Sequence, residues 1–70
     1  MVTSMTPRQL DLLAAWWQVG TVKGAAARIG VSEQTAKNML LLARARAGVS
    51  SNVELLTLNL DQLRSRYIAP

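Results

Sequence analysis

Residues 25–35 read AAARIGVSEQT, and this stretch decides the fold. Three alanines give a helix a smooth surface, Gly30 supplies the backbone freedom that a tight turn needs, and Ser32 is a strong N-cap. Ile29 and Val31 flank the glycine and fit the space between two helices. The stretch therefore predicts two packed helices joined by a short turn, as in a helix-turn-helix motif. An ordinary corner between two helices is the alternative interpretation.

Signals for helix ends extend this pattern in both directions along the chain. Thr6 to Gln9 form a capping box with Pro7 at the first helical position, and Ser51 begins a second capping box. Thr21 is a further N-cap candidate. Three glycines are placed to end helices, namely Gly20, Gly30 and Gly48. We therefore expect an all-α fold of four helices, over about residues 7–19, 22–29, 33–47 and 52–66.

The length predicts one small domain. A chain of 70 residues has room for a single core, and it contains no linker or repeat. We expect residues 6–67 to form this domain, with tails at residues 1–5 and 68–70. The last helix is expected to bury one apolar stripe, made of Val53, Leu56, Leu60, Leu63 and Tyr67.

The composition argues against catalysis and against membrane insertion. The sequence has no cysteine and no histidine, so common metal ligands and the commonest general base are missing. The carboxylates are scattered, at Asp11, Glu33, Glu54 and Asp61. The longest apolar run, residues 12–17, is far shorter than the roughly 20 residues that span a bilayer, and no signal peptide is visible. We expect a soluble, cytoplasmic protein that is not an enzyme and that binds no cofactor or metal.

The positive charge is concentrated in the middle of the chain. The formal net charge is +4, and residues outside 21–48 balance one another. Within that segment, Glu33 alone opposes five basic residues, namely Lys23, Arg28, Lys37, Arg44 and Arg46. A local basic stripe indicates a nucleic-acid partner, and a solvated helix surface is the alternative.

A longer pattern runs without a gap over about residues 6–56. It consists of Thr6-Pro7-Arg8-Gln9, Leu12-Leu13, Ala26, Ile29-Gly30-Val31-Ser32, Thr35, Lys37-Asn38, Gly48-Val49 and Val53-Glu54-Leu55. This pattern resembles the DNA-binding domain of the LuxR/GerE family, and the C-terminal domain of sigma factors is a weaker match. The resemblance implies a four-helix unit in which helix 33–47 reads the major groove. It also implies that helix 22–29 braces the reading helix and that the last helix is a dimer contact.

The chain departs from the family pattern in its core residues. Gly24 stands where the family usually has a glutamate, although glycine favours a helix by about 1 kcal/mol less than alanine. The core face of helix 33–47 is unusually small, with Ala36, Met39, Ala43 and Ala47. Trp16 and Trp17 stand where smaller residues are usual, so we expect both indoles to fill the space beside these alanines.

The outer face of helix 33–47 carries the candidate DNA contacts. On a helical wheel Gln34 and Asn38 lie opposite the core positions, and their amides match the donor and acceptor of adenine. We expect base contacts from Gln34, Lys37, Asn38 and Leu41. Phosphate contacts are expected from Lys23, Thr21, Ser32, Thr35, Arg44 and Arg46. The alternative for each residue is a solvent-exposed helix surface.

Apolar side chains off the core face point to a protein contact. Leu41 and Leu42 form an apolar spot on helix 33–47, and Leu55 and Leu58 leave the stripe of the last helix. A homodimer or partner surface is therefore expected at Leu42, Leu55 and Leu58.

Charge and resemblance together predict a sequence-specific DNA-binding transcriptional regulator. We expect it to bind double-stranded DNA as a homodimer and to be associated with the nucleoid, and a minimal bacterial or bacteriophage regulator fits its size. Residues 1–5 leave no room for a sensor before the first helix, so we expect a stand-alone regulator, and a piece of a larger protein is the alternative. One alternative is a protein-interaction module that binds RNA polymerase or another regulator. The other is a non-specific DNA binder.

Overall fold

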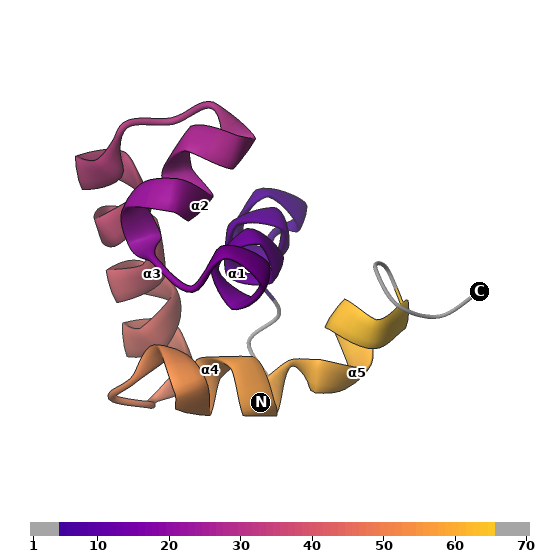
Figure 1. The fold of residues 1–70 in the computed structure, drawn as a ribbon. Helices are drawn as coiled ribbons and strands as arrows, with labels where there is room; N and C mark the ends of the chain where they lie inside the picture. The colour runs from indigo at the N-terminus through magenta and orange to yellow at the C-terminus, as the bar shows by residue number, and fades with distance from the viewer. Residues whose placement is uncertain (1–4, 66–70) are drawn as a thin grey trace.

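The computed structural model describes residues 5–65, which form five α-helices and the turns between them (Figure 1). The helices are α1 (Pro7–Val19), α2 (Val22–Ile29), α3 (Glu33–Ala47), α4 (Asn52–Leu58) and α5 (Leu60–Leu63). No strand occurs within residues 5–65, and the expected all-α class is confirmed. The bounds of α1, α2 and α3 agree with the ranges expected from the sequence.

Local hydrogen bonds explain why the helices begin where they do. The Thr6 backbone N–H donates to Gln9 Oε1 at 3.0 Å and Gln9 N donates to Thr6 Oγ1 at 3.2 Å, which completes the capping box. Only one of the two hydrogen bonds of the second capping box forms, in which Glu54 N donates to Ser51 Oγ at 3.1 Å. The Glu54 carboxylate instead accepts from Ser50 Oγ at 3.3 Å.

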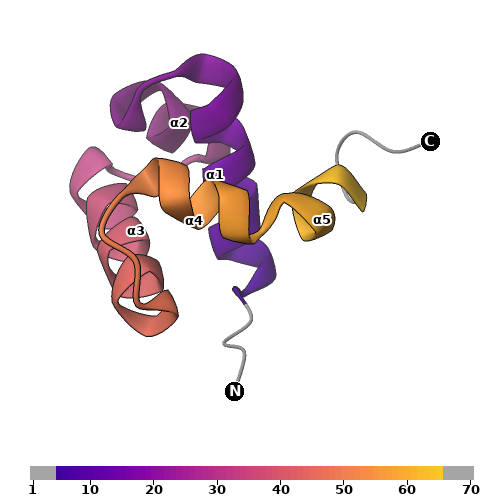
Figure 2. The same ribbon diagram turned by 90° about the horizontal axis from the view of Figure 1, so that it is seen from below.

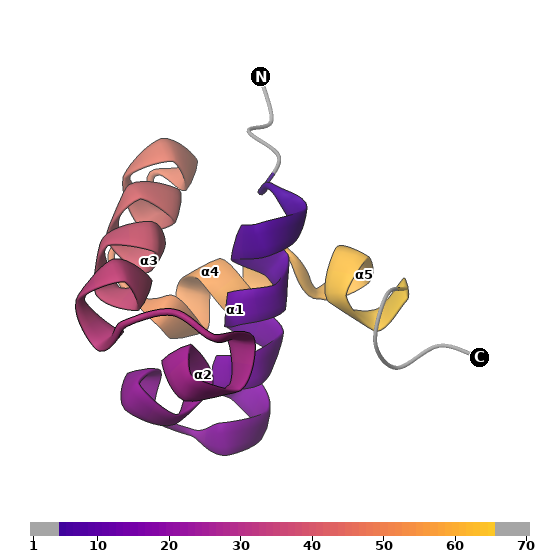
Figure 3. The same cartoon turned by 90° about the horizontal axis from the view of Figure 1, so that it is seen from above.

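The helices pack around α1. Figures 1 and 3 show α3 on one side of α1 and α5 on the other, and Figure 2 shows α4 crossing α1 and linking the two sides. The largest fully buried side chains are leucines from four of the helices, namely Leu12, Leu13, Leu40, Leu55 and Leu63. On α3, Ala36, Leu40 and Ala43 are buried, while Met39 and Ala47 pack partly against the core. The core face of α3 therefore consists mainly of small side chains around one leucine, as the sequence predicted.

The prediction that both tryptophans fill the core is wrong for Trp17. Trp16 packs against the core, but Trp17 is 44% exposed. The buried residues of α1 end at Ala15, and Trp17, Gln18 and Val19 are all exposed, so the last turn of the helix extends beyond the core. Met5, which the sequence placed in a tail, is buried beside the leucines. The remainder of the two predicted tails, residues 1–4 and 68–70, lies outside the described residues.

The prediction of a single helix over residues 52–66 is wrong, because the helix is interrupted at Asn59. This residue has φ −110° and ψ 17°, and its side-chain Nδ2 donates to Leu55 O at 2.8 Å. A side chain that bonds a nearby backbone carbonyl, here four residues earlier, competes with helix continuation. The predicted stripe is correct only in part. Leu63 is fully buried and Leu56 packs against the core, but Val53 is exposed, and Leu55, which is not in the stripe, is fully buried. Tyr67 and the predicted helix end at residue 66 lie outside the described residues.

Packing between α1 and α2 explains the glycine in α2. A Cβ built on Gly24 would lie 2.4 Å from Val19 Cγ1 and 3.0 Å from Thr21 Oγ1. Val19 is β-branched and stiff at χ1, and Thr21 Oγ1 is fixed because it caps α2 by accepting from Gly24 N. The position therefore needs a residue without a side chain.

Replacing this glycine tests the packing. In a helix, alanine is favoured over glycine by about 1 kcal/mol. We nevertheless expect Gly24→Ala to lower the free energy of unfolding by about 1 kcal/mol, because overpacking outweighs the gain. Urea unfolding followed by circular dichroism measures the change. In a Val19→Ala background the same substitution is expected to stabilise, and a gain in the unmodified chain would contradict the close contact.

Candidate nucleic-acid interface

The turn between α2 and α3 sets the orientation of the candidate reading helix. Gly30 lies in the left-handed region at φ 80° and ψ 33°, and its N–H donates to Ala26 O at 2.9 Å. Val31 N also donates to Ala26 O, at 3.0 Å, which closes the end of α2. Ser32 then caps α3 by accepting from Thr35 N at 3.0 Å. Capping hydrogen bonds on both sides of Gly30 and Val31 therefore set the direction in which α3 leaves α2.

Arg8 ties this turn to α1, a role that sequence reasoning missed. Its Nη2 donates to Ile29 O at 3.0 Å across a separation of 21 residues. The bond satisfies a carbonyl at the C-terminal end of α2, where a cation is also favoured by the helix dipole. Arg8 is therefore a positioning residue for the α2–α3 turn. A local pattern cannot reveal a partner so far along the chain.

The four residues expected to contact bases all lie on the exposed side of α3. Gln34, Lys37, Asn38 and Leu41 are solvent-exposed, and Ala36 and Leu40 beneath them are buried. Gln34 Nε2 donates to Asn38 Oδ1 at 3.2 Å. This bond does not use the Asn38 amide donors or the Gln34 carbonyl oxygen, and both residues are exposed. The outer face of α3 thus carries both hydrogen-bond donors and hydrogen-bond acceptors.

Lys37 forms an ion pair with Glu33. Lys37 Nζ lies 3.3 Å from Glu33 Oε2, and the side chains are 57% and 45% exposed. The two residues are four positions apart, so they share one flank of α3. Charge that the sequence assigned to a DNA contact is therefore balanced within the helix.

The residues expected to contact phosphates differ in whether their side chains already form hydrogen bonds within the protein. Lys23 and Arg46 are exposed on α2 and α3. The hydroxyls of Thr21 and Ser32 cap their helices, and Ser32 Oγ also donates to Thr35 Oγ1 at 2.8 Å. Arg44 is partly buried and donates to Asn52 Oδ1 on α4. These bonds hold the hydroxyls and Arg44 in place around the ends of α2, α3 and α4.

The expected partner surface loses one of its three residues. Leu55 is fully buried, so it is not available for a contact with another chain. The break at Asn59 and the capped start of α4 turn this residue inward. Leu42 and Leu58 are exposed by 59% and 61%, and the neighbours Leu41 and Val53 are exposed to a similar extent.

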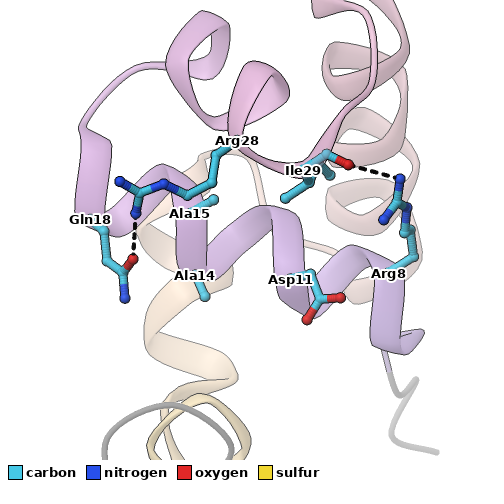
Figure 4. A pocket seen from close by; sticks show the side chains of 7 residues that line it. All are labelled: Arg8, Asp11, Ala14, Ala15, Gln18, Arg28 and Ile29. Atoms are coloured by element: carbon cyan, nitrogen blue, oxygen red, sulfur yellow. Dashed lines mark hydrogen bonds between the residues drawn. The ribbon is translucent and has the colours of Figure 1, made fainter.

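A groove of about 400 Å³ lies between α1 and α2 (Figure 4). Arg28 Nη1 donates to Gln18 Oε1 at 2.7 Å at one end, and Arg8 bonds Ile29 at the other. The carboxylate of Asp11 lies between them, so the groove carries charges of both signs. Arg28 therefore belongs to this groove and adds nothing to the outer face of α3. Within residues 5–65 no group of three or more acidic side chains is placed to hold a metal ion.

The comparisons with known proteins identify no relative of this chain. No family model, no curated protein and no solved structure matches it. Across residues 5–65, none of the helices has the length and hydrophobicity needed to cross a membrane.

Proposed function

We propose that this chain is a sequence-specific DNA-binding transcriptional regulator that inserts α3 into the major groove. The observation that supports this most strongly is the outer face of α3, where exposed Gln34, Lys37 and Asn38 stand on a helix fixed by a capped turn. The major groove, about 12 Å wide, admits a helix and displays a distinct pattern of donors and acceptors for each base pair. The fold is proposed as a variant of the LuxR/GerE type in which Asn59 shortens the fourth helix.

The paired amides supply the proposed base readout. Adenine presents N7 as an acceptor and N6 as a donor in the major groove. With Gln34 bonded to Asn38, the Asn38 Nδ2 group donates to N7 while Gln34 Oε1 accepts from N6. Holding both side chains in advance lowers the entropy lost on binding. We propose that the binding site contains an adenine at this contact.

A homodimer is proposed through the exposed apolar residues of α4. Leu58 and Val53 are each 61% exposed, which leaves apolar area for a second copy to cover. A two-fold dimer places two copies of α3 on half-sites about one helical turn of DNA apart. A palindromic binding site is the expected consequence.

Protein interaction is the second candidate function, favoured by one observation. Leu41 and Leu42 are 55% and 59% exposed on adjacent positions of α3. Exposed apolar side chains that lie together mark contact sites for other proteins. In this alternative the chain binds RNA polymerase or another regulator.

Selection from random duplex DNA tests the proposal. We expect the purified protein at near-physiological salt to enrich one motif, and a Lys37→Ala/Asn38→Ala double variant to lose it. A palindromic motif would support the homodimer. Weak binding to all duplexes without enrichment would contradict sequence-specific regulation. In that case we expect the chain to bind a partner protein, and we expect Leu41→Asp or Leu42→Asp to abolish that binding.

A further inference from the structure

The groove between α1 and α2 carries three charged side chains that the proposed DNA contact does not use. Figure 4 shows Arg8 and Arg28 toward its two ends and the carboxylate of Asp11 between them. Each arginine uses one nitrogen in an internal bond, Arg8 Nη2 to Ile29 O and Arg28 Nη1 to Gln18 Oε1. A guanidinium group has five N–H donors, and a carboxylate accepts several hydrogen bonds. These side chains therefore have donors and acceptors beyond those that the two bonds occupy.

The surface between the charged groups is small and apolar. Ala14 and Ala15 are each 4% exposed, and Ile29 is half-buried beside them. The volume of the groove, about 400 Å³, falls in the range of small-molecule sites, about 300–1,000 Å³. Such sites combine apolar walls with a few polar groups that orient the ligand. The groove thus fits a small molecule with a short aliphatic part and charged ends.

The signs of the three charges limit the ligand further. A simple anion is attracted by the two arginines but repelled by Asp11, and a simple cation is repelled by both arginines. A ligand with two carboxylates and one ammonium group complements all three charges. An acidic amino acid carries these groups when it is free. Within a peptide chain the same residue loses the charge of its α-amino group, of its α-carboxylate, or of both.

We propose that the α1–α2 groove binds a free acidic amino acid, aspartate or glutamate. Arg8 and Asp11 are three positions apart on α1 and share one face of the helix, so they bind the adjacent α-carboxylate and α-ammonium groups. Arg28 binds the side-chain carboxylate, and the aliphatic carbons lie over Ala14 and Ala15. The inference goes beyond the proposed function and does not depend on DNA binding, because these side chains belong to α1 and α2.

The test is a titration of the isotope-labelled protein with three ligands, followed by amide NMR shifts. L-Glutamine lacks the side-chain charge of L-glutamate, and glutarate lacks its ammonium group. We expect L-glutamate to bind about two- to fivefold more tightly than either, the factor for one ion pair that water still reaches. The largest shifts are expected at Ala14, Ala15 and Arg28.

Two variants assign each charge of the ligand to its partner. Arg28→Gln is expected to abolish the preference for L-glutamate over L-glutamine and to keep the preference over glutarate. Asp11→Asn is expected to do the reverse. Arg64→Gln and Asp61→Asn change the net charge equally at exposed residues outside the groove, so both preferences are expected to remain. Circular dichroism checks that all four variants fold.

Three results would overturn the inference. They are equal affinities for the three ligands, shifts confined to residues outside the groove, and equal effects of Arg28→Gln and Arg64→Gln on the affinity for L-glutamate. The last result would show that the ligand responds to net charge alone. Each can be observed whether or not the chain selects a DNA motif, so failure of this inference is distinct from failure of the proposed function.

Discussion

Leu40→Ala is expected to lower the free energy of unfolding by about 2–5 kcal/mol, the usual range for truncating a buried leucine. Leu40 is 1% exposed and is the largest side chain that α3 buries. A domain of this length has about 4–10 kcal/mol of stability in total, so the variant is expected to be largely unfolded near 37 °C. Thermal unfolding followed by circular dichroism measures the loss.

The neighbouring leucine is the matched control. Leu41 precedes an exposed position and is itself 55% exposed, so Leu41→Ala is expected to change stability by no more than about 0.5 kcal/mol. The two variants remove the same atoms from adjacent residues. Equal losses would show that α3 is rotated from the orientation described, and the assignment of its outer face would then be wrong.

The ends of α1, α2 and α3 were predictable because the signals that set them are local. Thr6, Thr21 and Ser32 each accept a hydrogen bond from a backbone N–H three residues ahead. Gly30 adopts the left-handed conformation that its place in the sequence indicated. Such signals act within one turn of helix, and their outcome depends little on the rest of the chain.

The last third of the chain was predicted less well because its structure depends on packing. Asn59 lies in an apolar pattern that fits one long helix, yet its side chain bonds Leu55 O in a buried position. On the two sides of this break Leu55 and Leu63 are fully buried, and Val53 is left exposed. No local signal shows which apolar residues of a short amphipathic helix will face the core when several alternatives are equally apolar.

The sequence predicted which face of helix 33–47 is exposed, but it did not predict the hydrogen bonds and ion pairs formed there. Helical spacing placed Gln34 and Asn38 opposite the core, and both are exposed. The same helical spacing also indicates an ion pair between Glu33 and Lys37, because they lie four residues apart. A count of charges along the sequence does not reveal this pairing. The bond from Arg8 to the α2–α3 turn could not be seen in the sequence at all, because it joins distant segments.

Asn38→Ala is expected to weaken binding to the selected motif by about 1–3 kcal/mol, or roughly five- to 150-fold. The substitution removes the amide that donates to adenine N7 in the proposed complex, and it also releases Gln34 from its hydrogen bond. Affinity for a random duplex is expected to stay unchanged, because an uncharged side chain releases no counterions. Titration of both duplexes at one salt concentration measures the two effects separately.

Gln62→Ala is the control, since it removes an exposed amide from α5 and is expected to leave both affinities unchanged. Lys37→Ala is expected to weaken both duplexes and to reduce the salt slope by about 1. The contrast between Asn38 and Lys37 separates base reading from charge, because only a base contact affects one sequence more than another. If Asn38→Ala weakened both duplexes equally, α3 would be binding the backbone, and the chain would be a non-specific DNA binder.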